Sequence, residues 1–266
     1  MVDKVQAPAW SQRHILVTGG ARGIGRSVTQ ALLAQGARVT VLGRSLPDGA
    51  ALRTLAGSDE AAERLHAVAA DVSDPEAVAA AFAAARARFG AIDTLVNNAG
   101  QASSAPALKT DLALWQRMLA VNLTGAWVCT QQALPGMVQA GWGRVVNVAS
   151  TAAQRGYAYV SAYCAAKHGV LGLTRALALE LATKGVTVNA VCPGFTETDL
   201  LADSVANIMA KTGRTEEQAR ADLAAGNPQK RLIQPQEVAD AVLWLCQPGS
   251  GSVTGQAVSV SGGEVM

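Results

Sequence analysis

Short runs of apolar and β-branched residues recur along the chain, and longer segments with a helical apolar period separate them. The short runs have the length and composition of buried strands. Strands that alternate with helices pair in parallel, because each helix carries the chain back across one face of the sheet. The pattern predicts an α/β fold, a doubly wound parallel sheet of about seven strands with helices on both faces. The predicted strands are His14–Thr18, Arg38–Leu42, His66–Ala70, Thr94–Asn97, Val145–Val148, Val186–Val191 and Ala257–Val260.

The segments between the strands also indicate how the chain is organised. Two long helices are predicted at residues 112–139 and 157–184. Residues 195–227 are rich in Thr, Asp, Glu and Ala and show no strand pattern, which predicts a partly helical, mobile lid. No linker rich in Gly, Ser or Pro interrupts the chain, so residues 1–266 are expected to form a single domain.

Composition excludes several classes of protein. Half of the residues are apolar, and the net charge of +2 comes from interspersed acids and bases, so no nucleic-acid partner is expected. No apolar run approaches the roughly 18 residues of a membrane span, and residues 1–13 lack a continuous apolar stretch, which predicts a soluble, untargeted protein without a membrane partner. The four cysteines show no metal-ligand spacing, so we expect buried, reduced thiols in a cytoplasmic protein without a metal: Cys129, Cys164, Cys192 and Cys246.

A glycine-rich turn, Thr18–Gly25, joins the first predicted strand to the helix that follows it. Glycines permit positive φ and let a pyrophosphate approach the backbone, while the helix N-terminus offers free N–H groups and a partial positive charge. The turn therefore predicts a dinucleotide site on a Rossmann-type fold. On its own, such a turn also fits a purely structural role.

The end of the second predicted strand indicates which dinucleotide is bound. In nucleotide folds that select NAD, an acidic residue there binds the adenosine ribose hydroxyls and repels a phosphate. Here the strand ends in Gly43, followed by Arg44 and Ser45, and Arg22 lies within the glycine-rich turn. A guanidinium can hold a phosphate through two parallel, charge-assisted hydrogen bonds. This favours NADP(H) over NAD(H), unless both arginines are ordinary surface residues.

Tyr163 and Lys167 are four residues apart in the second long helix, which places them on one helix face. A nearby ammonium favours the ionised phenol and lowers the tyrosine pKa from its usual value of about 10. Such a phenol can exchange a proton with a carbonyl or alcohol oxygen. Taken alone, the pair more often marks a helix face that meets water.

The order of the motifs along the whole chain is more specific than any one of them. They are the turn Thr18–Gly25, Asp71-Val72, Asn97–Gly100, Asn122, Ser150, Tyr163 with Lys167, Asn189, Pro193-Gly194 and Thr198. In this order they resemble the short-chain dehydrogenase/reductase family, in its one-domain branch, from about His14 to Gly263. Within that family the chain is most similar to 3-oxoacyl reductases and polyketide ketoreductases.

The resemblance implies catalytic roles for four residues. Tyr163 is the general acid in reduction and the base in oxidation, and Lys167 lowers its pKa and binds the nicotinamide ribose. Ser150 orients the substrate oxygen. Asn122 holds a water that connects Lys167 to solvent.

The resemblance also implies where the cofactor lies, with Asp71 and Val72 at the adenine and the segment from Pro193 to Thr198 around the nicotinamide. Adjacency to motifs makes Gln101, Gln154, Tyr157 and Phe195 candidates for the substrate pocket. The full set of expected cofactor contacts is Thr18, Gly19, Arg22, Gly23, Ile24, Gly25, Arg44, Ser45, Asp71, Val72, Asn98, Ala99, Gly100, Tyr163, Lys167, Pro193, Gly194 and Thr198.

The sequence thus predicts an oxidoreductase that transfers hydride between NADP(H) and a ketone or 3-oxoacyl thioester and the corresponding secondary alcohol. An alternative is an NAD-dependent dehydrogenase of a secondary alcohol or 3-hydroxyacyl thioester, because the same residues serve both directions. A more remote alternative is a non-catalytic nucleotide-binding protein. The family commonly pairs its long helices between subunits, so a homotetramer is expected.

Overall fold

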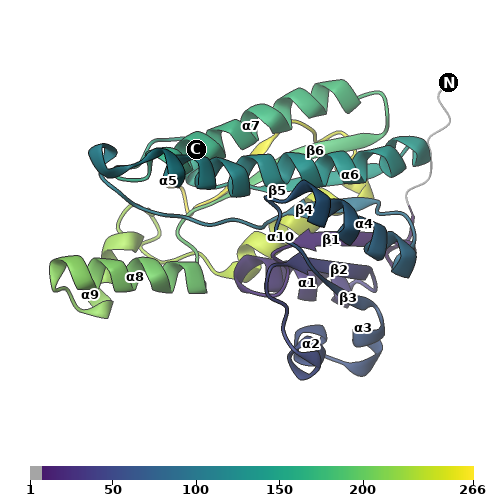
Figure 1. The fold of residues 1–266 in the computed structure, drawn as a ribbon, viewed down its shortest axis with the longest axis horizontal. Helices are drawn as coiled ribbons and strands as arrows, with labels where there is room; N and C mark the ends of the chain where they lie inside the picture. Colours follow the sequence, from purple (N-terminus) through teal and green to yellow (C-terminus); the bar gives the residue numbers. More distant parts are fainter. Residues whose placement is uncertain (1–7) are drawn as a thin grey trace.

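Seven parallel strands form one sheet in the computed structural model, which describes residues 8–266 (Figure 1). The strand order is β3-β2-β1-β4-β5-β6-β7. The predicted doubly wound, Rossmann-type sheet of about seven strands is confirmed. Residues 1–7, which belong to the N-terminal stretch 1–13 considered above, lie outside the described residues. The strands are β1 His14–Thr18, β2 Arg38–Gly43, β3 Leu65–Ala69, β4 Thr94–Asn97, β5 Gly143–Val148, β6 Val186–Pro193 and β7 Ala257–Val260.

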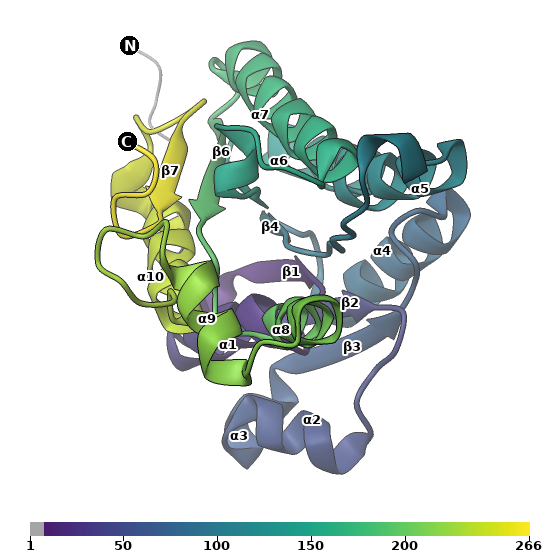
Figure 2. The same cartoon turned by 90° about the vertical axis from the view of Figure 1, so that its left-hand side faces the viewer.

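Helices cover both faces of the sheet (Figures 1 and 2). Alternate residues of β1 separate the two layers: Ile15 and Val17 pack with α1 and α10, and Leu16 packs with α4, α6 and α7. Across residues 8–266, no helix has both the length and the apolar character needed to cross a membrane. The helices are α1 Gly23–Ala34, α2 Gly49–Ala56, α3 Asp59–Glu63, α4 Pro75–Phe89, α5 Leu112–Leu119, α6 Gly125–Ala140, α7 Ser161–Leu181, α8 Asp199–Thr212, α9 Glu216–Ala224 and α10 Pro235–Cys246.

The strand order reverses between β1 and β4, and this leaves a crevice at the carboxyl ends of the strands. The Thr18 hydroxyl at the end of β1 accepts hydrogen bonds from the backbone N–H groups of Asn98 and Ala99 at 3.0 and 2.9 Å, and so fixes the floor of the crevice. Figure 2 looks onto this end of the sheet and shows α8 and α9 in front of the strands. The segment predicted to be partly helical is therefore built mainly of these two helices.

A buried histidine lies at the opposite, amino end of β1. The Gly90 carbonyl can only accept a hydrogen bond, so the 2.9 Å contact places the His14 proton on Nδ1, and Nε2 accepts from the Thr40 hydroxyl at 2.9 Å. The side chain is 1% exposed. Burial lowers the pKa of His14 to about 4, because the charged imidazolium loses its water.

Protonation of His14 is expected to make the protein less stable in mild acid. Its pKa is lower in the folded chain than in the unfolded chain, so the stabilisation is complete above pH 6.5 and is lost as the pH falls toward 4. The loss should reach about 3 kcal/mol, measured by urea unfolding over this pH range. His14→Gln removes the titrating group, and its unfolding free energy should vary less with pH. If the unfolding free energy of His14→Gln fell with pH as steeply as that of the wild type, His14 would not be the group responsible.

Candidate active site

A cavity of about 1160 Å³ opens at the carboxyl ends of the strands and brings most of the predicted site residues together. It is large enough for a dinucleotide together with a small substrate, since pockets for drug-sized ligands are usually about 300–1000 Å³. The predicted residues that line it are Gly19, Arg22, Gly23, Ile24, Arg44, Ser45, Asp71, Val72, Asn98, Ala99, Gly100, Gln101, Asn122, Ser150, Tyr157, Tyr163, Lys167, Pro193, Gly194, Phe195 and Thr198.

The glycine-rich turn fits a pyrophosphate because its glycines cannot be replaced without moving the backbone. A Cβ on Gly25 would lie 2.1 Å from the Gly19 carbonyl oxygen, and Gly19 and Gly23 have φ of 65° and 50°. No side chain caps the N-terminus of α1, and Gly23 and Ile24 face the cavity. This positive helix end is therefore free to receive an anion.

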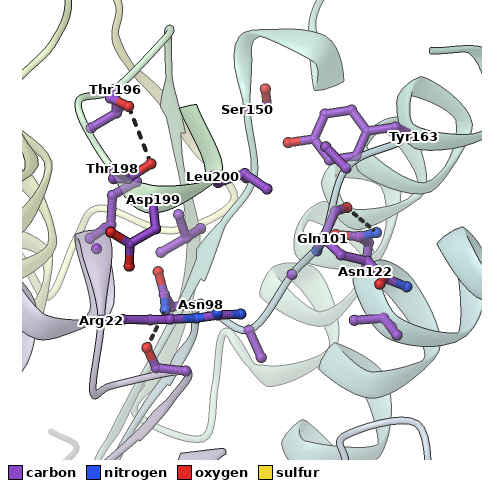
Figure 3. Close-up of a pocket in the computed structure, with 18 of the residues that line it drawn as sticks. Arg22, Asn98, Gln101, Asn122, Ser150, Tyr163, Thr196, Thr198, Asp199 and Leu200 are labelled. Carbon is purple, nitrogen blue, oxygen red and sulfur yellow. Dashed lines mark hydrogen bonds between the residues drawn. The ribbon is translucent and has the colours of Figure 1, made fainter. Parts of the chain in front are cut away.

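The residues after β2 fit the additional phosphate of NADP(H). Arg44 and Ser45 are exposed and line the cavity, and Arg22 extends across it toward Asn98 (Figure 3). Within residues 8–266, neither arginine forms a side-chain hydrogen bond or an ion pair. Burial raises the pKa of Asp71, but hydrogen bonds from Ser73 and the charge of Arg44 bring it below its usual value. Arg44 thus lies near Asp71, with its guanidinium hydrogen bonds still available.

Tyr163 and Ser150 meet in the cavity, at the start of α7 and after the end of β5 (Figure 3). The Ser150 hydroxyl accepts from the Ala152 backbone N–H at 3.1 Å, because Ser150 caps the short helix Thr151–Ala153. Burial raises the pKa of Tyr163, and the neighbouring Ser150 hydroxyl only partly offsets this. The phenol therefore stays protonated at neutral pH, which is the form that donates a proton.

In this structure burial raises the pKa of Tyr163 and no lowering by Lys167 is seen, so the lowering by Lys167 stays a prediction. Lys167 Nζ lies 5.7 Å from the centre of the Tyr163 ring and donates a hydrogen bond to the Val148 carbonyl at 2.9 Å. Burial lowers the pKa of Lys167 itself to about 8. Helical spacing places the two residues on one face, but it does not account for the loss of water around both groups.

Asn122 lies in a π-helical turn, Ala120–Thr124, between α5 and α6. Such turns often occur at functional sites. Asn122 Nδ2 donates to the carbonyls of Gln101 and Met118, both at 3.0 Å. A Cβ on Gly100 would lie 2.9 Å from Asn122 Oδ1 and 3.7 Å from Lys167 Nζ. Asn122 and Lys167 thus lie close to Gly100 on the same wall of the cavity, and only a residue without a side chain fits between them.

Three expected site residues lie behind the cavity surface. Thr18 and Gly25 support the turn from beneath. The Gln154 side chain points to β7, where its Oε1 accepts a hydrogen bond from the Ser259 hydroxyl at 3.0 Å, so it forms no part of the pocket wall. Sequence adjacency could not distinguish it from Tyr157, because both follow the same motif.

The sequence analysis missed the residues that α8 brings to the cavity. Asp199, Leu200 and Asn207 of α8 line it, and Asn207 donates to the Ser104 hydroxyl on the opposite side at 3.3 Å. Nothing in the local sequence indicates these contacts, because Ser104 and Asn207 are remote in the chain. Among the described residues, no group of His, Cys, Asp or Glu side chains is placed to hold a metal ion.

The fold, the glycine-rich turn and the arrangement of Ser150, Tyr163 and Lys167 define a class of oxidoreductase. Residues 13–208 match the short chain dehydrogenase family, and the chain belongs to this family. The family predicted from the ordered motifs is thereby confirmed.

Similar proteins include both reductases and dehydrogenases. The chain is 40% identical to cis-4-hydroxycyclohexanecarboxylate dehydrogenase of Sinomonas cyclohexanicum, over 96% of this chain and 97% of the relative. It is 36% identical to the 3-oxoacyl-acyl-carrier-protein reductase of Vibrio harveyi, over 94% and 96%. A structure of an actinorhodin polyketide ketoreductase variant with NADPH is 38% identical, with a TM-score of 0.88 over 97% of this chain and 99% of that one.

Proposed function

We propose that the protein reduces a ketone or 3-oxoacyl thioester to a secondary alcohol with NADPH. One observation carries the proposal: a phenol that burial keeps protonated lies beside the Ser150 hydroxyl, in the same cavity as the unpaired Arg22 and Arg44. The similar 3-oxoacyl reductase and polyketide ketoreductase support the substrate class.

The chemistry of the cavity assigns a role to each group. NADPH supplies the hydride when bound. The Ser150 and Tyr163 hydroxyls hold the substrate oxygen, and Tyr163 donates its proton to that oxygen as negative charge develops there. Lys167 would hold the nicotinamide ribose, and a water between Lys167 and Asn122 would relay a proton from solvent to restore the Tyr163 hydroxyl after each reduction.

The remaining residues of the cavity bind and enclose the two ligands. The turn around Gly19 and the N-terminus of α1 hold the pyrophosphate, and Arg22, Arg44 and Ser45 hold the ribose phosphate. We propose that residues 1–266 act as one domain in which the segment 195–227 moves as a lid over a small-molecule substrate. Four buried, unpaired cysteines support a reducing, cytoplasmic location.

A spectrophotometric screen of NADPH oxidation with simple ketones, aromatic ketones and acetoacetyl thioesters tests the proposal. Turnover of at least one of these classes is expected. The similar dehydrogenase favours a second candidate, oxidation of a secondary alcohol with NAD. Faster turnover of NAD with secondary alcohols than of NADPH with every ketone would favour that candidate instead.

We propose a homotetramer assembled through the long helices. Exposed apolar side chains lie on α5, α6 and α7, among them Trp115, Trp127 and the 82% exposed Leu179. Trp127→Glu places a charge in the proposed contact and should shift the sedimentation coefficient toward smaller species. Leu108→Glu, which changes a fully exposed apolar residue outside the long helices, should not. A wild-type monomer at micromolar concentration would contradict the proposal.

A further inference from the structure

A chain of three hydrogen-bonded side chains closes one wall of the cavity with a residue near the C-terminus. Tyr157 Oη lies 2.5 Å from Glu264 Oε1 and 2.8 Å from Thr151 Oγ1. A carboxylate can only accept, so the single phenol proton is donated to Glu264, and the Thr151 hydroxyl donates to the phenol oxygen. Thr151 directly follows Ser150, so this chain of bonds begins beside the proposed catalytic residues.

Glu264 is held between the two ends of the lid segment. A Cβ on Gly194 would lie 3.1 Å from Glu264 Oε2, and one on Gly226 would lie 3.4 Å from Oε1. Gly194 directly precedes this segment and Gly226 lies at its far end. The carboxylate therefore has little room to move, and it gives the Tyr157 hydroxyl a fixed partner.

Tyr157 and Phe195 form an aromatic wall of the cavity. Their ring centroids are 6.3 Å apart with an interplanar angle of 77°, an edge-to-face arrangement. Both residues line the cavity together with Tyr163, whereas Glu264 does not. The Tyr157 hydroxyl is hydrogen-bonded to Glu264, which lies outside the cavity. Tyr157 therefore presents its apolar ring to a substrate.

The charges around Tyr157 keep this arrangement intact at neutral pH. Burial, the hydrogen bond to Glu264 and its negative charge raise the pKa of Tyr157 to about 12, so the hydroxyl remains a donor. The Arg155 guanidinium lies 4.9 Å from the centre of the Tyr157 ring but does not line the cavity. Arg155 is exposed to solvent, whereas the Tyr157 ring lines the cavity.

We propose that Glu264 is a positioning residue that sets substrate specificity: it anchors Tyr157 so that the Tyr157–Phe195 wall receives an aromatic or bulky apolar group of the substrate. The inference rests on the proposed reductase function and names its substrate class. Without the carboxylate, the Tyr157 hydroxyl keeps only its contact with Thr151, so the ring is held less firmly and this wall becomes mobile. A small aliphatic substrate that does not reach the wall is insensitive to the change.

Equilibrium binding to the enzyme saturated with NADPH tests the inference without turnover, because an alcohol cannot be reduced further. Calorimetry compares 1-phenylethanol with 2-butanol. Glu264→Ala should weaken binding of the aromatic alcohol about threefold to tenfold, the value of one aromatic contact, and that of 2-butanol less than twofold. Glu264→Gln keeps a hydrogen-bond acceptor and should bind both alcohols as the wild type does. The matched control is Glu217→Ala, which removes an exposed lid carboxylate.

A double-mutant cycle separates positioning from a general structural effect. Tyr157→Phe keeps the ring but loses the anchor, and adding Glu264→Ala to it should cause no further loss of 1-phenylethanol affinity. Should Glu264→Ala fail to fold, Tyr157→Phe alone must show the selective loss. Equal losses for the two alcohols, or additive losses in the double variant, would overturn the inference. Absence of NADPH oxidation with every ketone would instead overturn the proposed function.

Discussion

Tyr163→Phe is expected to lower kcat for ketone reduction by about 10²- to 10⁴-fold, the usual contribution of a general acid. The substitution removes the phenol proton beside Ser150 and keeps the ring. Burial holds the pKa of Tyr163 above its ordinary value, so the proton is present at neutral pH in the wild type and is the group that the variant lacks. Steady-state kinetics with NADPH and a reactive ketone measure the loss.

Binding of NADPH should change little in the same variant, because the residues assigned to the pyrophosphate and the ribose phosphate are untouched. Fluorescence titration measures this independently of turnover. Tyr159→Phe is the matched control, since Tyr159 is 66% exposed and does not line the cavity. If Tyr163→Phe kept more than about a tenth of the wild-type kcat, the proton-donor assignment would be wrong.

The wild type is expected to prefer NADP(H) to NAD(H) by at least about tenfold in kcat/KM, and Gly43→Asp with Arg44→Ala should invert that preference. One charge-assisted hydrogen bond to a phosphate already provides a tenfold difference. The inversion needs both changes, because specificity comes from losing the attraction and adding a repulsive carboxylate.

The structure allows this substitution at the end of β2. A Cβ on Gly43 would meet only the Ser45 carbonyl oxygen within 4 Å, at 3.8 Å, so a side chain can begin at this position without moving the strand. Arg44 lies near Asp71, and the variant leaves that carboxylate without its cationic neighbour. Gly43→Ala is the control for the added Cβ and should keep the wild-type preference. A wild type that is faster with NADH at subsaturating concentration would contradict the assignment and favour the dehydrogenase alternative.

Much of this protein follows from local patterns in its sequence. The apolar runs predict all seven strands to within one or two residues, since strand length and β-branched composition are local properties. The turn from Thr18 to Gly25 predicts the phosphate-binding end of the cavity, because positive φ and close backbone approach require glycine wherever the fold places it. The order of the motifs also predicts the family.

Only the tertiary structure decided how groups remote in sequence act on one another. It directed the Gln154 side chain to Ser259 of β7 and the Tyr157 ring to the cavity, although both residues follow Ser150 closely. It reversed the expected direction of the Tyr163 pKa shift, because burial depends on every element packed around α7. It also joined Glu264 to Tyr157, more than a hundred residues earlier in the chain. Helical period and glycine content are properties of short sequence segments. Burial and long-range hydrogen bonds form only when the sheet brings its loops together at one edge.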